Sequence, residues 1–197
     1  MGLFDKILKK KNKDLKLKDL GDNSCDKKDN LQAYIEIARI VCDGDEKVIQ
    51  EASDCIFNPQ NYFNAHKERY ENRGIDEFSD SIFNKWIGLV DILIIHNYVC
   101  ERDWKDEKED FMYFLNNLKG FKENNLTIDS EWLNEDDDIV KWCQVLDEKW
   151  NSQGIGVMCF DIGSDSFVFF LGKLANLECL KESASLLGQR IDFAKYM

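Results

Sequence analysis

Two apolar runs around a short polar loop decide the fold: IGVMCF at residues 155–160, DIGSD at 161–165 and SFVFFL at 166–171. Each run has the length of a β-strand, and Asp, Gly and Ser in the loop favour a turn. We therefore predict a hairpin. Residues 99–104 are rich in β-forming types and have no helical periodicity, which predicts an edge strand beside it. The alternation in Ile191-Asp192-Phe193 predicts a final strand.

Helical periodicity dominates the rest of the chain. Residues 82–95 form the predicted central core helix, in which little more than the stripe of Asn84, Gly88 and Asp91 stays polar. The fold class is therefore α+β, with a helical N-terminal part packed with a small, mainly antiparallel sheet and flanking helices at the C-terminal side. Further helices are predicted at 31–42, at 48–56, from Pro59 to near Gly74, from Asp106 as cap to Gly120, from Asn134 as cap to Gly154, and at 174–187 before Gly188.

The first 29 residues differ from the rest in composition. Residues 1–20 hold seven lysines and three aspartates, which gives this segment a charge of +4, and residues 9–30 contain little that is apolar. This composition is typical of a solvated linker. We predict a basic tail and linker, partly disordered, over 1–29 and a single α+β domain over 30–197, with a sub-boundary near residue 98 as the alternative.

Charge restricts the partners of the chain. Its 197 residues carry a formal net charge of −12, and the segment after residue 20 carries −16. Nucleic-acid binding needs clustered Lys and Arg against phosphate, so this surface has the wrong sign for it. A basic protein is the partner that this charge favours.

Cysteine usage and the first residues indicate a compartment. The seven cysteines are spread along the chain without a C-x-x-C pair, which fits buried, reduced thiols. Residues 1–6 lead into lysines rather than into an apolar stretch, so no secretory signal is expected. Both patterns predict a cytoplasmic protein.

Common catalytic and cofactor motifs are missing from the sequence. It holds no phosphate-binding glycine loop and no G-x-S-x-G, and neither His66 nor His96 has a second histidine or a carboxylate at metal-binding spacing. We therefore expect no cofactor, no metal and no enzymatic activity.

An acidic run at residues 135–138 could capture a basic protein. Complementary charge speeds association, and a buried aromatic side chain supplies affinity. The alternative interpretation is structural, because carboxylates in the first turn of a helix interact favourably with its macrodipole. A second acidic stretch, 103–110, also holds lysines and is interpreted as a solvated turn and helix start. The predicted partner-binding residues are Trp132, Glu135, Asp136, Asp137 and Asp138.

A rival hypothesis places an enzyme at the hairpin loop. Asp161 and Asp165 bracket this loop, and two carboxylates four residues apart could hold a divalent ion or act as acid and base, with His96 as a further group. The hypothesis predicts a hydrolase or a metal-dependent enzyme with these groups in one pocket. The same residues are also ordinary turn formers.

A third hypothesis is a peripheral membrane protein that uses residues 3–11. Leu3, Phe4, Ile7 and Leu8 would form one face of a short helix with lysines opposite, a pattern that can contact an anionic membrane. Position 6 is Lys where the myristoylation pattern requires Ser or Thr, so no lipid anchor is predicted.

Short motifs in the second half of the chain resemble an uncharacterised bacterial family of unknown function. They are RDWK at 102–105, FDIGSDSF at 160–167 and LGQRI at 187–191, and the resemblance covers residues 80–193. The family is similar in style to immunity proteins encoded beside polymorphic toxins. The resemblance implies a non-enzymatic, cytoplasmic protein that blocks a toxin through its acidic, aromatic-bearing face, and it carries over no catalytic residues.

Overall fold

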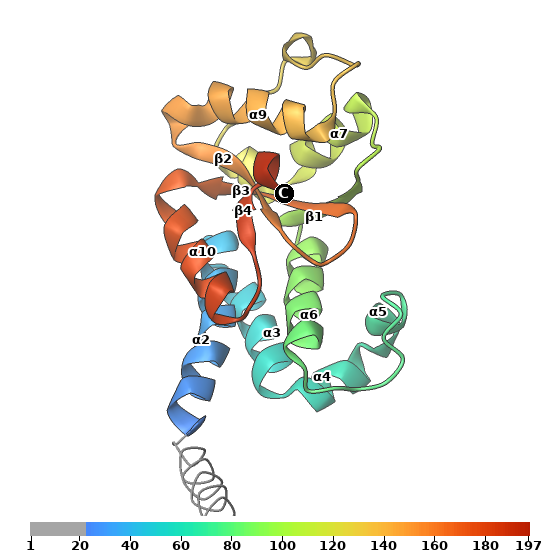
Figure 1. Cartoon of the computed structure of the whole chain (residues 1–197), viewed down its shortest axis with the longest axis vertical. Helices are drawn as coiled ribbons and strands as arrows, with labels where there is room; N and C mark the ends of the chain where they lie inside the picture. The colour runs from blue at the N-terminus through green and yellow to red at the C-terminus, as the bar shows by residue number, and fades with distance from the viewer. Residues whose placement is uncertain (1–22) are drawn as a thin grey trace, which may run out of the picture.

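The computed structural model describes residues 23–197 and has an α+β fold, as the sequence predicts (Figure 1). Within residues 23–197, five helices precede the first strand. They are α2 (Asn23–Val41), α3 (Glu46–Phe57), α4 (Pro59–Ala65), α5 (Lys67–Glu71) and α6 (Ile82–Ile95). The remainder is β1 (Val99–Asp103), α7 (Lys108–Asn117), α8 (Lys119–Glu123), η1 (Ser130–Trp132), α9 (Ile139–Trp150), η2 (Asn151–Gln153), β2 (Ile155–Phe160), β3 (Ser166–Lys173), η3 (Leu174–Asn176), α10 (Leu177–Leu186), β4 (Ile191–Phe193) and η4 (Ala194–Tyr196).

The sheet has the order β1-β3-β2-β4, and all its pairs are antiparallel. The predicted hairpin is confirmed as β2 and β3, in which Cys159 lies opposite Phe169. β1 is an edge strand as predicted, and β4 forms the other edge. The sheet therefore contains both the strand that follows α6 and the last strand of the chain.

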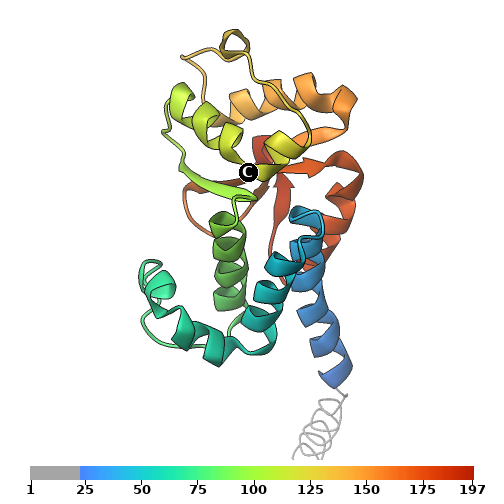
Figure 2. The same cartoon turned by 180° about the vertical axis from the view of Figure 1, so that it is seen from behind.

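Helices cover both faces of this sheet (Figures 1 and 2). Met158 and Phe170 face the cluster built by α2, α3, α6 and α10, whereas their neighbours Cys159 and Phe169 face the cluster built by α7, α8 and α9. Because both faces of the sheet are buried, the sequences of β2 and β3 are continuous apolar runs without alternating polar residues. Two cores share one sheet.

α6 is the central helix of the larger core. Ser81 caps it by accepting a hydrogen bond from Asn84 N at 3.1 Å, and its Trp86 indole donates to Asp161 O at 2.7 Å. The predicted polar stripe is wrong at Gly88, which is buried. A Cβ there would come within 2.6 Å of Cys55 Sγ and 2.7 Å of the Tyr70 hydroxyl oxygen, so glycine permits close packing with α3 and α5.

Two predicted helices differ from those in the structure. The helix expected from Pro59 to near Gly74 is divided into α4 and α5 at His66, whose φ of −125° and ψ of 32° are not helical. The predicted cap Asp106 instead pairs with Arg102, and α7 begins after Glu107. Gly120 does not end that helix but lies inside α8, because Leu118 adopts an extended conformation and starts a new turn.

The N-terminal prediction lies mostly outside the described residues. α2 begins at Asn23, seven residues before the expected start of the domain, and residues 1–22 are not described. The membrane hypothesis for residues 3–11 therefore falls outside the described part of the chain. From residue 23 onward, no helix combines the length and apolar character needed to cross a bilayer.

Candidate functional site

The predicted acidic run forms an exposed turn before α9, not its first turn. Asn134 was the predicted cap, but its side chain accepts from Asp136 N at 3.3 Å within the turn. Asp138 is the actual N-cap, with Oδ1 2.9 Å from Lys141 N. Glu135, Asp136 and Asp138 are exposed and Asp137 is half-buried. Of the four carboxylates, only Asp138 therefore caps the helix.

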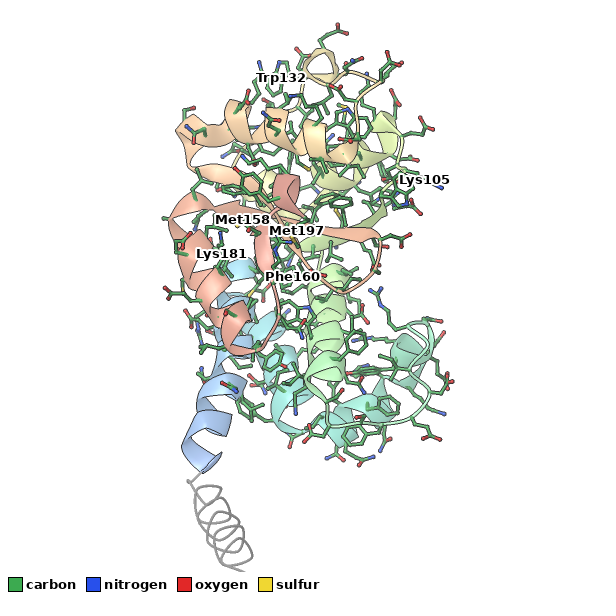
Figure 3. The ribbon with its side chains drawn as sticks, in the orientation of Figure 1. Lys105, Trp132, Met158, Phe160, Lys181 and Met197 are labelled. Carbon is green, nitrogen blue, oxygen red and sulfur yellow. The ribbon has the colours of Figure 1, made fainter. Side chains whose placement is uncertain are left out.

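Trp132 lies beside α9, at the end of the molecule away from α2 (Figure 3). Its side chain is half-buried and packs against the smaller core. The Lys149 ammonium lies 4.8 Å from the centre of its indole ring, a cation–π distance. Trp132 is thus held in place within the molecule, and Lys149 would have to move before a partner could cover the ring on that side.

Lys108 brings the two acidic stretches together. Its Nζ lies 3.3 Å from Glu135 Oε1 and 3.5 Å from Leu133 O, and its side chain is only 11% exposed. The first turn of α7 therefore adjoins the turn before α9. We call the combined surface the acidic face; it consists of Glu107, Glu109, Asp110, Glu135, Asp136, Asp137 and Asp138.

Two exposed aromatic side chains accompany the acidic face. Tyr113 is 63% exposed and follows Glu109 by one helical turn, so both lie on the same side of α7. Trp104 is 52% exposed and lies three residues before Glu107. Sequence reasoning missed these residues, because the stretch 103–110 was interpreted as a solvated turn and its contact with 133–135 is not local.

The residues of the rival enzyme hypothesis are only partly brought together. Asp161 and Asp165 line one hollow of about 240 Å³ at the end of the hairpin, together with Arg190. Asp161 Oδ1 accepts from Gly163 N at 2.9 Å, as in an ordinary turn. His96 lies elsewhere: Trp86, which contacts Asp161, precedes it by ten residues, or about 15 Å of helix.

No group of three or more His, Cys, Asp or Glu side chains in residues 23–197 is arranged to hold a metal ion. Six cysteines from residue 30 onward are free, and all of them except Cys179 are buried: Cys42, Cys55, Cys100, Cys143, Cys159 and Cys179. Burial raises the pKa of Cys55 to about 11 and that of Cys159 to about 12, which keeps these thiols protonated and unreactive.

His96 belongs instead to a polar network centred on Glu51 of α3. One Glu51 oxygen accepts from the Tyr62 hydroxyl at 2.8 Å and from Arg69 Nη1 at 2.9 Å, and the other lies 2.8 Å from His96 Nε2. Burial alone would raise the pKa of Glu51, but the hydrogen bonds with His96, Arg69 and Tyr62 outweigh it and hold this pKa at about 2. The network fastens α3, α4, α5 and the end of α6 to one another.

A second buried carboxylate, Asp147, supports the smaller core. Its Oδ1 accepts from Val157 N at 2.8 Å, and its Oδ2 lies 2.8 Å from Lys195 Nζ. Burial raises the pKa of Asp147, although the nearby ammonium and amide act in the opposite direction. The short β4 pairs with residues 158–160 only, so this side chain satisfies an amide of β2 just beyond the ladder.

A family model for a domain of unknown function matches residues 33–194. The chain belongs to the DUF6630 family. The expectation of an uncharacterised domain family is therefore confirmed, and the DUF6630 domain includes the acidic face, the Glu51 network and the hairpin hollow. No curated protein and no solved structure matches the chain.

Proposed function

We propose that this DUF6630 domain is a non-enzymatic, cytoplasmic protein-interaction module that binds a basic protein through its acidic face. Its specific form would be a bacterial immunity protein that blocks a toxin, as the resemblance of the sequence motifs implies. The observation that carries the proposal is the contact of Lys108 with Leu133 O and Glu135, because it joins two acidic stretches into one surface.

Charge and aromatic side chains on this surface have complementary roles. Exposed carboxylates attract a basic partner and orient it during encounter. They contribute little to the affinity of the complex, because water screens ion pairs at the surface. Aromatic side chains at the centre of an interface contribute most to affinity. Tyr113 is available for this role. Trp104 is exposed as well, but, like Trp132, which the sequence favoured, it has a lysine ammonium 4.8 Å from its ring centre that a partner would displace.

The experiment is capture of partners from the host lysate with the tagged chain at low and high salt, followed by mass spectrometry. A Glu109→Lys, Asp136→Lys variant changes the charge of the acidic face. It leaves in place Asp138, which caps α9, and Glu135, which pairs with Lys108. The matched control is Glu178→Lys, Glu182→Lys on α10, where both side chains are exposed.

We expect a stoichiometric basic partner that the wild type and the control retain and that the face variant loses. Both variants change the net charge equally, and each changes one acidic residue in the first turn of a helix. Equal retention by the two variants would show that the partner binds elsewhere. A chain that captures no basic partner at either salt concentration would refute the proposal.

A further inference from the structure

A hollow of about 830 Å³ lies between α3 and α4. These two helices lie at the opposite end of the molecule from α7 and α9, which adjoin the acidic face (Figure 1). Its volume is in the range of small-molecule sites. Successive turns of α3 form one wall, and α4 with His66 forms the other. The lining residues include Glu46, Gln50 and Asp54 of α3 and, opposite them, Tyr62, Ala65 and His66.

The floor of the hollow is rigid. Glu51 and Tyr62 are fixed there by the hydrogen bonds to each other and to Arg69 and His96. The His66 ring packs against Tyr62 with 4.3 Å between centroids. Burial and the nearby Arg69 guanidinium lower the pKa of His66, so this imidazole is neutral at pH 7 and does not repel a cation. Such a site needs little rearrangement to receive a ligand.

The charge of the walls favours a positive ligand. Glu46, Gln50 and Asp54 follow one another at four-residue intervals, so they line one side of α3. Among the side chains of residues 30–197, neither Glu46 nor Asp54 is placed in an ion pair, and Lys47 is the one lysine or arginine that lines the hollow. Glu51 is already neutralised by Arg69.

Asp54 also occupies a locally unfavourable position. It lies in the last turn of α3, which holds no basic residue, so its negative charge opposes the helix macrodipole. Its Oδ1 accepts a hydrogen bond from Gln50 Nε2 at 3.4 Å, which does not neutralise the charge. A bound cation would relieve this repulsion.

We propose that the hollow binds a linear organic cation of the polyamine class, with its amino groups against Asp54 and Glu46. The two carboxylates are eight helical residues apart, or about 12 Å along the axis, a span that an extended triamine covers. The aliphatic carbons of the ligand lie over Ala65 and the Tyr62–His66 wall. This site is separate from the acidic face and does not depend on the function proposed for that face.

The test is calorimetric titration of the full chain with spermidine. One variant, Asp54→Asn with Glu46→Gln, removes the charges and keeps the shape. A second, Ala65→Phe, keeps the charges and fills the hollow at an exposed helical position. The matched control, Glu178→Gln with Glu182→Gln, removes two exposed carboxylates from α10. Thermal unfolding of each variant verifies that it is folded.

We expect the charge variant to raise the Kd for spermidine about tenfold, as the loss of two ion pairs predicts. The filled variant should raise it by about the same factor, because the phenyl ring occupies the space of the ligand, and the control should match the wild type. Binding that survives Ala65→Phe would show that the cation lies outside the hollow. An equal loss in the control would show attraction by net charge alone. Either result, or a wild type that does not bind spermidine, overturns the proposal.

Discussion

At the scale of single residues, Glu51 does the most to hold the helical part together. It joins side chains that follow it by 11, 18 and 45 residues, namely Tyr62, Arg69 and His96. Sequence patterns could not predict these three contacts, because local periodicity identifies only residues that are neighbours on one helix or strand. Sequence reasoning singled out His96 at the end of a helix but assigned it to Asp161 and Asp165, which lie at the hairpin end.

We expect Glu51→Gln to lower the free energy of unfolding by about 1–3 kcal/mol near pH 7, because the charge-assisted hydrogen bonds to a half-buried carboxylate are lost. The pKa of Glu51 falls from 4.5 to about 2 on folding. A depressed pKa stabilises the folded state above the unfolded value, and this stabilisation is lost as the pH falls from 4.5 towards 2. The difference between wild type and variant should therefore shrink in acid.

Urea unfolding at about pH 7, 5 and 3 measures this difference. Glu68→Gln serves as the control, because Glu68 is an exposed glutamate in α5. If the difference between wild type and Glu51→Gln stays constant down to the lowest pH, the carboxylate does not stabilise the folded state in its ionised form.

At the scale of elements, the sequence predicts that a helix exists better than it predicts which residue is its N-cap. Asn134 and Asp138 are both good caps by residue type. The apolar stripe of α9 starts at Ile139, directly after Asp138, whereas Asn134 O receives the indole N–H of Trp142 at 2.7 Å. The tertiary contact of Trp142 thus fixes Asn134 in the turn and leaves the cap to Asp138.

Asp138→Ala should destabilise the protein by about 0.5–2 kcal/mol, because Lys141 N loses its hydrogen-bond acceptor at the start of α9. Asp136→Ala is the matched control, since Asp136 is an exposed acid two residues away whose side chain caps no helix. Thermal unfolding of both variants measures the effect. Equal melting temperatures would mean that the cap contributes nothing.

The strands were easier to predict than the arrangement of the helices that pack on the two faces of the sheet. Apolar runs of strand length and a Gly-bearing loop specify β2 and β3 locally. The end of α10 was also predicted correctly, because Gly188 follows it with a positive φ of 65°. Gly154, with a φ of 71°, does not end α9 as predicted but caps η2, since α9 ends at Trp150. That α7 and α9 cover one face while α2 and α10 cover the other depends on long-range packing, which no local pattern encodes.

At the scale of the whole molecule, the two cores depend on the same two strands. Cys159 and Phe160 are neighbours in β2, yet the first belongs to the smaller core and the second to the larger one. Loss of either core would expose one complete face of β2 and β3 to water. We therefore expect that the helical part up to residue 98 does not separate from the remainder without disrupting the sheet that both cores share.

This sharing predicts a single cooperative unfolding transition for both cores. Trp86 is buried in the larger core and Trp150 in the smaller one, so each reports on its own side of the sheet. Fluorotryptophan labelling, with the two signals assigned through Trp86→Phe and Trp150→Phe, follows them separately in a urea titration. We expect the two folded signals to disappear with the same midpoint, because neither core retains its cover once β2 and β3 separate. Distinct midpoints would show that residues 23–98 and 99–197 unfold as separate units, and that the boundary near residue 98 divides the domain.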